Sequence, residues 1–158
     1  MSQTMITAEP GVQSVTISRE IAAPPELVYR AYVDPELIPR WWGPRYLTTT
    51  IEKQEPRLGG QWRYIQRDPA GNTHGFHGVY HLVEEGRQTV RTFEYEGVPG
   101  HVSLETVRFE PSAGGTRVVT TAVFQSLEDR DGMMASGMEF GVNEGFEQLE
   151  ELLQELGS

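Results

Sequence analysis

The sequence predicts an α+β fold in which a curved antiparallel sheet wraps around one long C-terminal helix. Three observations support this prediction. Residues 14–21 alternate between apolar and polar side chains, as a half-buried strand does. Strand-like segments joined by Gly- and Pro-containing turns fill residues 47–124, which indicates an antiparallel meander and a sheet of about six or seven strands. Glu128–Leu156 then repeats apolar side chains at steps of three and four, the period of one long amphipathic helix.

Two short helices are expected after the first strand. Residues 22–26 begin the first helix, because proline fits the first turn, where its missing N–H costs nothing. Asp34-Pro35-Glu36 begins the second helix in the same way, and Pro39 ends it quickly. Residues 1–13 show no such pattern, so we expect a flexible N-terminal tail followed by a single domain over residues 14–157.

The meander is divided by turn residues into segments with alternating faces. In residues 73–83, Phe76, Tyr80 and Leu82 alternate with His77 and His81, and the apolar set is assigned to the side that faces the helix. The two histidines are then expected to point to solvent, whereas burial would indicate a metal site or an acid–base pair. The predicted strands are Leu47–Gln54, Gln61–Arg67, Thr73–Val83, Arg87–Tyr95, Val102–Glu110 and Thr116–Phe124.

The apolar face of the C-terminal helix changes character along its length. Its second half carries leucines, whereas its first half carries Met134 and Met138 together with Gly137, Gly141 and Gly145. A glycine in a helix interior is less favourable than alanine by about 1 kcal/mol, so these glycines require a reason. Either a neighbouring backbone packs very closely there, or space is left open beside adaptable methionines.

Composition excludes several classes of function. The formal net charge is −10, and an acidic chain repels phosphate backbones, so no nucleic-acid partner is expected. The chain has no cysteine, which excludes disulfides and a thiol nucleophile and fits a cytoplasmic location. No apolar run approaches the length of a membrane span, and no secretory signal is visible.

The order of elements and three groups of residues resemble the START-like (SRPBCC) superfamily, and within it the bacterial homologues of the activator of the large heat-shock ATPase. The resemblance spans about residues 14–156. It implies a helix-grip fold with a cavity between helix and sheet. The residues that carry it are Asp34-Pro35-Glu36-Leu37 with Trp41-Trp42-Gly43-Pro44; Arg57-Leu58-Gly59-Gly60-Gln61-Trp62 with Gly71 and Gly78-Val79-Tyr80; and Ser136-Gly137-Met138-Glu139 with Gly141 and Leu149-Glu150-Glu151-Leu152-Leu153.

Aromatic and small side chains are the candidate ligand-binding residues. They either form plain core or line an apolar pocket in which the Tyr64 and Tyr80 hydroxyls serve as polar groups. Arg91 and Glu105 lie in strands whose alternation is ambiguous; an inward-pointing charge there would need a partner and would orient a ligand. The candidate ligand-binding residues are Trp41, Trp42, Trp62, Tyr64, Phe76, Tyr80, Met134, Met138, Gly141 and Gly145.

Three functions compete at this point. The first is non-enzymatic binding of a small hydrophobic or aromatic molecule in the cavity. The second is a polyketide cyclase- or hydrolase-like enzyme working in the same cavity. The third is a co-chaperone-like module that binds a heat-shock ATPase through its exterior. The sequence contains no HExxH, GxSxG or phosphate-binding glycine motif, so no catalytic residue, metal or cofactor is predicted. Both a monomer and a homodimer remain open.

Overall fold

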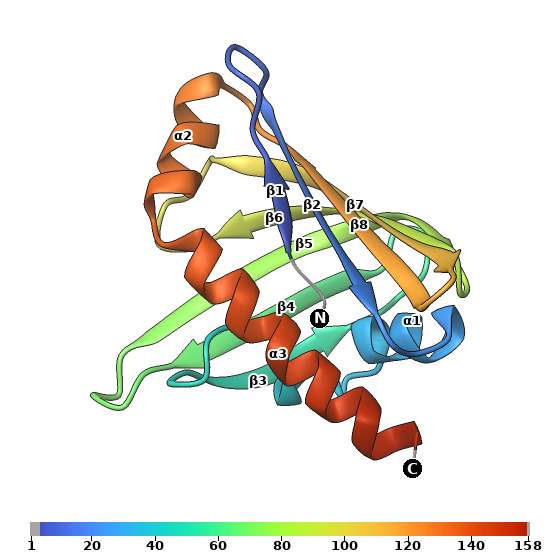
Figure 1. Ribbon diagram of the computed structural model, residues 1–158. Coiled ribbons are helices and arrows are strands. Elements are labelled where there is room, and N and C mark those ends of the chain that lie inside the picture. Colours follow the sequence, from blue (N-terminus) through green and yellow to red (C-terminus); the bar gives the residue numbers. More distant parts are fainter. Residues whose placement is uncertain (1–3, 158) are drawn as a thin grey trace.

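One continuous antiparallel sheet forms the body of the molecule, shown in Figure 1 as a computed structural model that describes residues 4–157. The described residues form eight strands, slightly more than expected, in the order β1-β2-β8-β7-β6-β5-β4-β3. The strands are β1 (Met5–Thr7), β2 (Ser14–Ile21), β3 (Thr48–Gln54), β4 (Gln61–Arg67), β5 (Thr73–Glu84), β6 (Gln88–Tyr95), β7 (Val102–Ser112) and β8 (Gly115–Val123).

The long C-terminal helix crosses the concave side of this sheet, with α2 at one end and the chain terminus at the other (Figure 1). This arrangement confirms the predicted α+β class and helix-grip architecture. Pro25 begins the first helix, as expected from its missing N–H. The helical elements are α1 (Pro25–Val33), the 3₁₀ helix η1 (Ile38–Arg40), α2 (Leu127–Ala135) and α3 (Met138–Gly157).

The prediction of one unbroken helix from Glu128 to Leu156 is wrong, because the chain turns sharply between α2 and α3. Gly137 has a φ of +86°, the left-handed conformation that commonly ends a helix and that glycine adopts without strain. Gly137 therefore terminates α2, and its presence needs no further explanation. Of the three glycines considered, Gly141 and Gly145 remain to be explained, and both lie inside α3.

The expected N-terminal tail takes part in the sheet. Residues 5–7 form β1, which pairs antiparallel with β2 and places Met5 opposite Ser18. From α2, the buried Arg130 side chain donates hydrogen bonds to the backbone carbonyls of Glu9 and Val12, which holds the turn between the two strands. A strand of three residues is too short for an alternating pattern to reveal. Residues 1–3 of the predicted tail lie outside the described residues.

The predicted faces of β5 hold, with one exception. Tyr80 is buried on the concave side, whereas His81 is exposed and His77 lies on the convex side, 2.8 Å from a Glu96 carboxylate oxygen. A β-bulge between Tyr80 and Leu82 shifts the alternation by one residue. Leu82 is consequently 39% exposed, and its assignment to the inner face is wrong.

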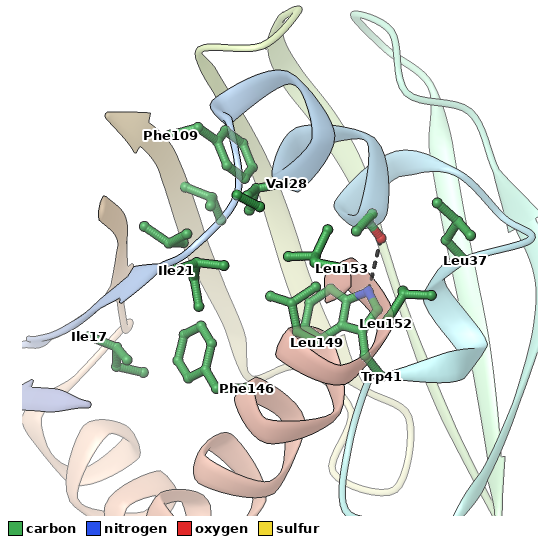
Figure 2. Packing of buried hydrophobic residues seen from close by; sticks show 14 of the residues in the cluster. Ile17, Ile21, Val28, Leu37, Trp41, Phe109, Phe146, Leu149, Leu152 and Leu153 are labelled. Carbon is green, nitrogen blue, oxygen red and sulfur yellow. Dashed lines mark hydrogen bonds between the residues drawn. The ribbon is translucent and has the colours of Figure 1, made fainter. Parts of the chain in front are cut away.

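The main core lies beneath the C-terminal half of α3. There Leu149, Leu152 and Leu153 pack against residues of β2, α1 and β7 (Figure 2). The Trp41 indole closes one side of this core, and its N–H donates to the carbonyl of Ala31 at 2.9 Å, the dashed line in Figure 2. Burying a leucine side chain contributes about 1.5–3 kcal/mol, so this half of the helix anchors α3.

A second, smaller core of Ile38, Trp62, Tyr64 and Tyr80 lies under β3–β6. The Trp62 indole N–H in this core donates a hydrogen bond to the Thr92 carbonyl at 3.0 Å. This contact requires glycine at position 78, because a Cβ there would lie 1.9 Å from the Thr92 oxygen and 2.6 Å from the Trp62 nitrogen.

Gly78→Ala is therefore expected to destabilise the protein by about 1–3 kcal/mol, the usual range for overpacking a core. Gly132→Ala is the matched control, because a Cβ at this helical position meets nothing within 4 Å. Better helix propensity should then raise stability by up to about 1 kcal/mol. Urea unfolding of both variants checks the pair, and equal stabilities would contradict the close approach at Gly78.

Candidate functional site

A pocket of about 290 Å³ lies between the first half of α3 and the concave face of the sheet. We call it the central pocket. Trp42 from the loop after η1 and Phe146 from α3 contribute to its apolar walls, and Gly141 lies on the α3 side. Arg91 and Glu105 contribute charged groups from the sheet. The central pocket thus combines aromatic walls with one charged region.

The structure places most of the candidate residues around this pocket. Trp62 and Phe76 do not line it; both belong to the smaller core on the β4–β6 side. Met134 belongs to α2, before the chain turns at Gly137, and packs against the main core. Ligand binding by the lining residues stays a prediction. The candidate residues that line the pocket are Trp41, Trp42, Tyr64, Tyr80, Met138, Gly141 and Gly145.

The two glycines of α3 have different surroundings. A Cβ at Gly145 would lie 3.4 Å from the Trp41 carbonyl oxygen, at the edge of ordinary van der Waals contact, so an alanine fits there with at most a slight shift. A Cβ at Gly141 would meet only the Pro44 Cδ, at 3.9 Å, and therefore points into space. The open-space explanation therefore applies to Gly141, whereas close packing of a neighbouring backbone does not require glycine at either position.

The loop that carries Trp41 and Trp42 is tied to α3 by polar contacts. The Gln148 side chain donates to the Gly43 carbonyl at 2.7 Å. Arg45 forms an ion pair with Glu151 at 2.6 Å. Exposed ion pairs contribute little individually, but together with the Gln148 bond they fix this wall of the pocket against the helix.

The charged part of the pocket consists of cross-strand neighbours. Arg91 on β6 lies directly opposite Glu105 on β7 and, on its other side, opposite Tyr80 on β5. The Arg91 Nε is 3.5 Å from a Glu105 carboxylate oxygen. The guanidinium also lies 3.9 Å from the centre of the Trp62 ring, a cation–π contact that stabilises a desolvated cation. Both charges therefore point inward, which the sequence left undecided.

A hydrogen-bonded chain connects the tyrosines to this ion pair. Arg91 donates from Nη1 to the Tyr64 hydroxyl at 3.0 Å, and Tyr64 donates to the Gln54 amide oxygen at 2.6 Å. The Gln54 amide nitrogen in turn donates to the Tyr80 hydroxyl at 2.8 Å. We call this set the polar cluster; its five members are Arg91, Glu105, Tyr64, Gln54 and Tyr80. The sequence predicted the two hydroxyls but carried no signal for Gln54.

Burial raises the pKa of two groups in the polar cluster. It raises the pKa of the Tyr64 hydroxyl, against the opposing effect of the Arg91 charge. Burial likewise raises the pKa of the Glu105 carboxyl, although the Arg91 charge and hydrogen bond act in the opposite direction. Tyr64 therefore remains a neutral phenol at physiological pH, and Glu105 takes up a proton more readily than an exposed glutamate.

The histidines lie away from the central pocket. His74 has its Nδ1 2.9 Å from the Tyr95 hydroxyl, and His101 has its Nδ1 2.9 Å from an Asp129 carboxylate oxygen. Within residues 4–157, no group of three or more His, Cys, Asp or Glu side chains is arranged to hold a metal ion. Over the same residues, no helix has both the length and the apolar character required to cross a bilayer.

Comparison with known protein families identifies the family of this chain. Residues 22–154 match the family model described as "Activator of Hsp90 ATPase homolog 1-like protein". The chain belongs to this family. The resemblance inferred from the tryptophan, glycine and helix motifs is thereby confirmed, and the match includes the loop with Trp41 and Trp42, strands β3 to β8 and most of α3.

Several solved structures share the whole fold. A protein from Rhodobacter sphaeroides aligns with a TM-score of 0.88 at 28% identity, covering 96% of this chain and 99% of the other. A protein from Arthrobacter aurescens aligns with a TM-score of 0.87 at 27% identity, covering 96% of this chain and 91% of the other. A protein from Mycobacterium smegmatis aligns with a TM-score of 0.86 at 23% identity, covering 96% of this chain and 97% of the other. At this identity the likeness supports the fold alone. The chain has no match among curated proteins.

Arg91→Met tests the ion pair. The substitution leaves the Glu105 carboxylate without its cationic partner, which should destabilise the protein by about 3 kcal/mol near neutral pH. The pKa of Glu105 is raised in the folded state, so the folded protein holds the proton more tightly than the unfolded chain does. Ionisation of Glu105 therefore lowers the free energy of unfolding as pH rises above the usual glutamate pKa. The stability gap between parent and variant should therefore widen between about pH 5 and pH 8, as measured by urea unfolding.

The double variant Arg91→Met/Glu105→Gln is the matched control, because it has no carboxyl to titrate at this position. Its stability relative to the parent should vary much less over the same pH range. A gap that stays constant for Arg91→Met would contradict the inward, desolvated position of Glu105.

Proposed function

We propose that this protein binds a small hydrophobic or aromatic molecule in the central pocket without converting it. The observation that supports this most directly is the open space beside Gly141. Leucine at that position would favour the helix and fill the space, so glycine is otherwise a loss of about 1 kcal/mol. The neighbouring Met138 adapts to ligands of differing shape.

The size and lining of the pocket fit such a ligand. Its volume of about 290 Å³ is at the lower end of the range for small-molecule sites, which suits a molecule of up to about three rings. Aromatic walls from Tyr32, Trp42 and Phe146 offer flat surfaces for ring stacking. The polar cluster provides a small number of groups that orient the ligand.

A second candidate function is an enzyme that uses the same pocket. Glu105 favours it, because a pocket carboxyl with a raised pKa is suited to general acid–base chemistry. Native mass spectrometry of the purified protein, with chemical analysis of any retained molecule, separates the two candidates. A molecule recovered unchanged after incubation supports binding, whereas a converted one supports the enzyme. A co-chaperone role, suggested by the family description, would use the exterior instead.

Gly141→Leu is the direct test of the binding proposal. The leucine should occupy the space beside Pro44, so that binding of the uncharged fluorescent probe N-phenyl-1-naphthylamine is lost. Thermal stability should hold or rise, because cavity filling and helix propensity both favour the folded state. A fluorescence titration and a melting curve measure the two effects on the same samples.

Gly157→Leu, at the end of the same helix, is the matched control, since a Cβ there meets nothing within 4 Å and the residue lies outside the pocket. It should leave probe binding unchanged. If Gly141→Leu instead lowers the melting temperature and the parent protein binds no probe, the region is tightly packed and the proposal fails.

A further inference from the structure

The polar cluster determines what kind of molecule the central pocket accepts. Arg91 and Glu105 supply the ionisable groups of this wall, and their side chains are 13% and 22% exposed. Most of the remaining wall is aromatic or aliphatic. A ligand that fills the pocket therefore places one end against this pair and the rest against apolar surface.

The hydrogen bonds inside the cluster show which atoms remain available. Arg91 Nη1 is used by Tyr64, whose own hydrogen is donated to Gln54. Neither Arg91 Nη2 nor the second Glu105 carboxylate oxygen has a hydrogen-bond partner among the described residues. The buried side-chain atoms without a partner in that part of the chain are Arg19 Nε and Ser112 Oγ. The unused Arg91 and Glu105 atoms are therefore not sealed in the core but are accessible from the pocket.

These atoms present a donor beside an acceptor. The face of the Arg91 guanidinium is covered by the Trp62 ring, which leaves the edge for hydrogen bonding. Glu105 lies directly opposite Arg91 in the strand register, so both groups are presented side by side. A ligand group with an acceptor and a donor on neighbouring atoms can satisfy both at once, and bonds to charged partners are the stronger ones.

The charges of the pair cancel, which sets the charge of the ligand. A carboxylate ligand would meet the Glu105 carboxylate, and an ammonium ligand would meet the Arg91 guanidinium, each in a desolvated site with its counter-charge already paired. An uncharged ligand avoids both conflicts. The hydroxyls of Tyr64 and Tyr80 are already engaged by Gln54, which accepts a hydrogen bond from the first and donates one to the second.

We propose that the central pocket selects uncharged aromatic molecules that carry an amide or hydroxy-carbonyl group, with that group held between Arg91 and Glu105. This inference rests on the proposed binding function and specifies its ligand class. The hydrogen-bond acceptor of the ligand faces the Arg91 edge, and its donor faces the Glu105 carboxylate. The ring lies between Trp42 and the Gly141 region of α3.

Three compounds with the same naphthyl ring test the proposal: 2-methylnaphthalene, 2-naphthamide and 2-naphthoate. Their affinities are measured at about pH 7.5, where the acid is ionised, by displacement of N-phenyl-1-naphthylamine. The amide should bind about tenfold more tightly than the methyl compound, as expected for hydrogen bonds to charged groups. It should exceed the carboxylate by at least about the same factor.

Glu105→Gln should reverse the preference, because Arg91 then carries an unpaired charge. Binding of 2-naphthoate should improve by about tenfold or more, while 2-methylnaphthalene binds as in the parent. Glu110→Gln is the matched control, since Glu110 is on the same strand, outside the pocket, and pairs with Arg108. It should leave all three affinities unchanged.

Equal affinities for the three compounds in the parent, or tightest binding of the carboxylate, would overturn the inference while leaving the binding function intact. An unchanged affinity of Glu105→Gln for 2-naphthoate would overturn it as well. If that variant does not fold, as judged by its melting curve, the ranking in the parent protein decides. If no compound and no probe binds, the proposed function itself is wrong and the inference falls with it.

Discussion

Three leucine side chains of α3 fill the concave side of the sheet beneath the C-terminal half of the helix: Leu149, Leu152 and Leu153. Leu149 is completely buried, and burying such side chains contributes about 1.5–3 kcal/mol each. This packing fixes the height of the helix above the sheet. The first half of α3 continues at that height without large side chains at Gly141 and Gly145, so the central pocket follows from a change in side-chain size along one helix.

The sheet contributes the complementary constraint, a charged pair facing an apolar space. Isolated charges would not remain in such a place, because desolvation of an ion costs several kcal/mol. Arg91 is compensated by Glu105, by the Tyr64 hydroxyl and by the face of Trp62. These contacts hold the guanidinium in one position. The result is a fixed polar group in a site whose other walls are adaptable, which is the usual design of small-molecule pockets.

The alternating and helical periods were sufficient to predict the architecture, because burial on one face leaves a repeat of two or of 3.6 residues. Local conformations that interrupt a period were not visible. The bulge after Tyr80 exposes Leu82, and the left-handed Gly137 divides a stretch that reads as one helix. The three-residue strand β1 is too short to have a period at all.

The candidate site was predicted in part for the same reason. The alternation of the strands places Tyr64 and Tyr80 on the inner face of the sheet. Glycines inside a helix are noticeable because glycine has a low helix propensity. Trp62 also faces inward, but it packs behind Tyr64 rather than against the pocket. The alternation of a strand predicts which face a side chain lies on, but not how far that side chain is from the pocket. Arg91 and Glu105 become recognisable only from the strand register, which places the two opposite each other.

The proposed function depends on ligand binding in the space between α3 and the sheet. The most direct measurement is a ¹⁵N–¹H NMR titration with N-phenyl-1-naphthylamine, which reports on every backbone amide and tryptophan indole. Saturable shifts concentrated at Trp42, Gly43 and Gly141 would support the account. Shifts concentrated around α2, or no shifts at saturating probe, would contradict it.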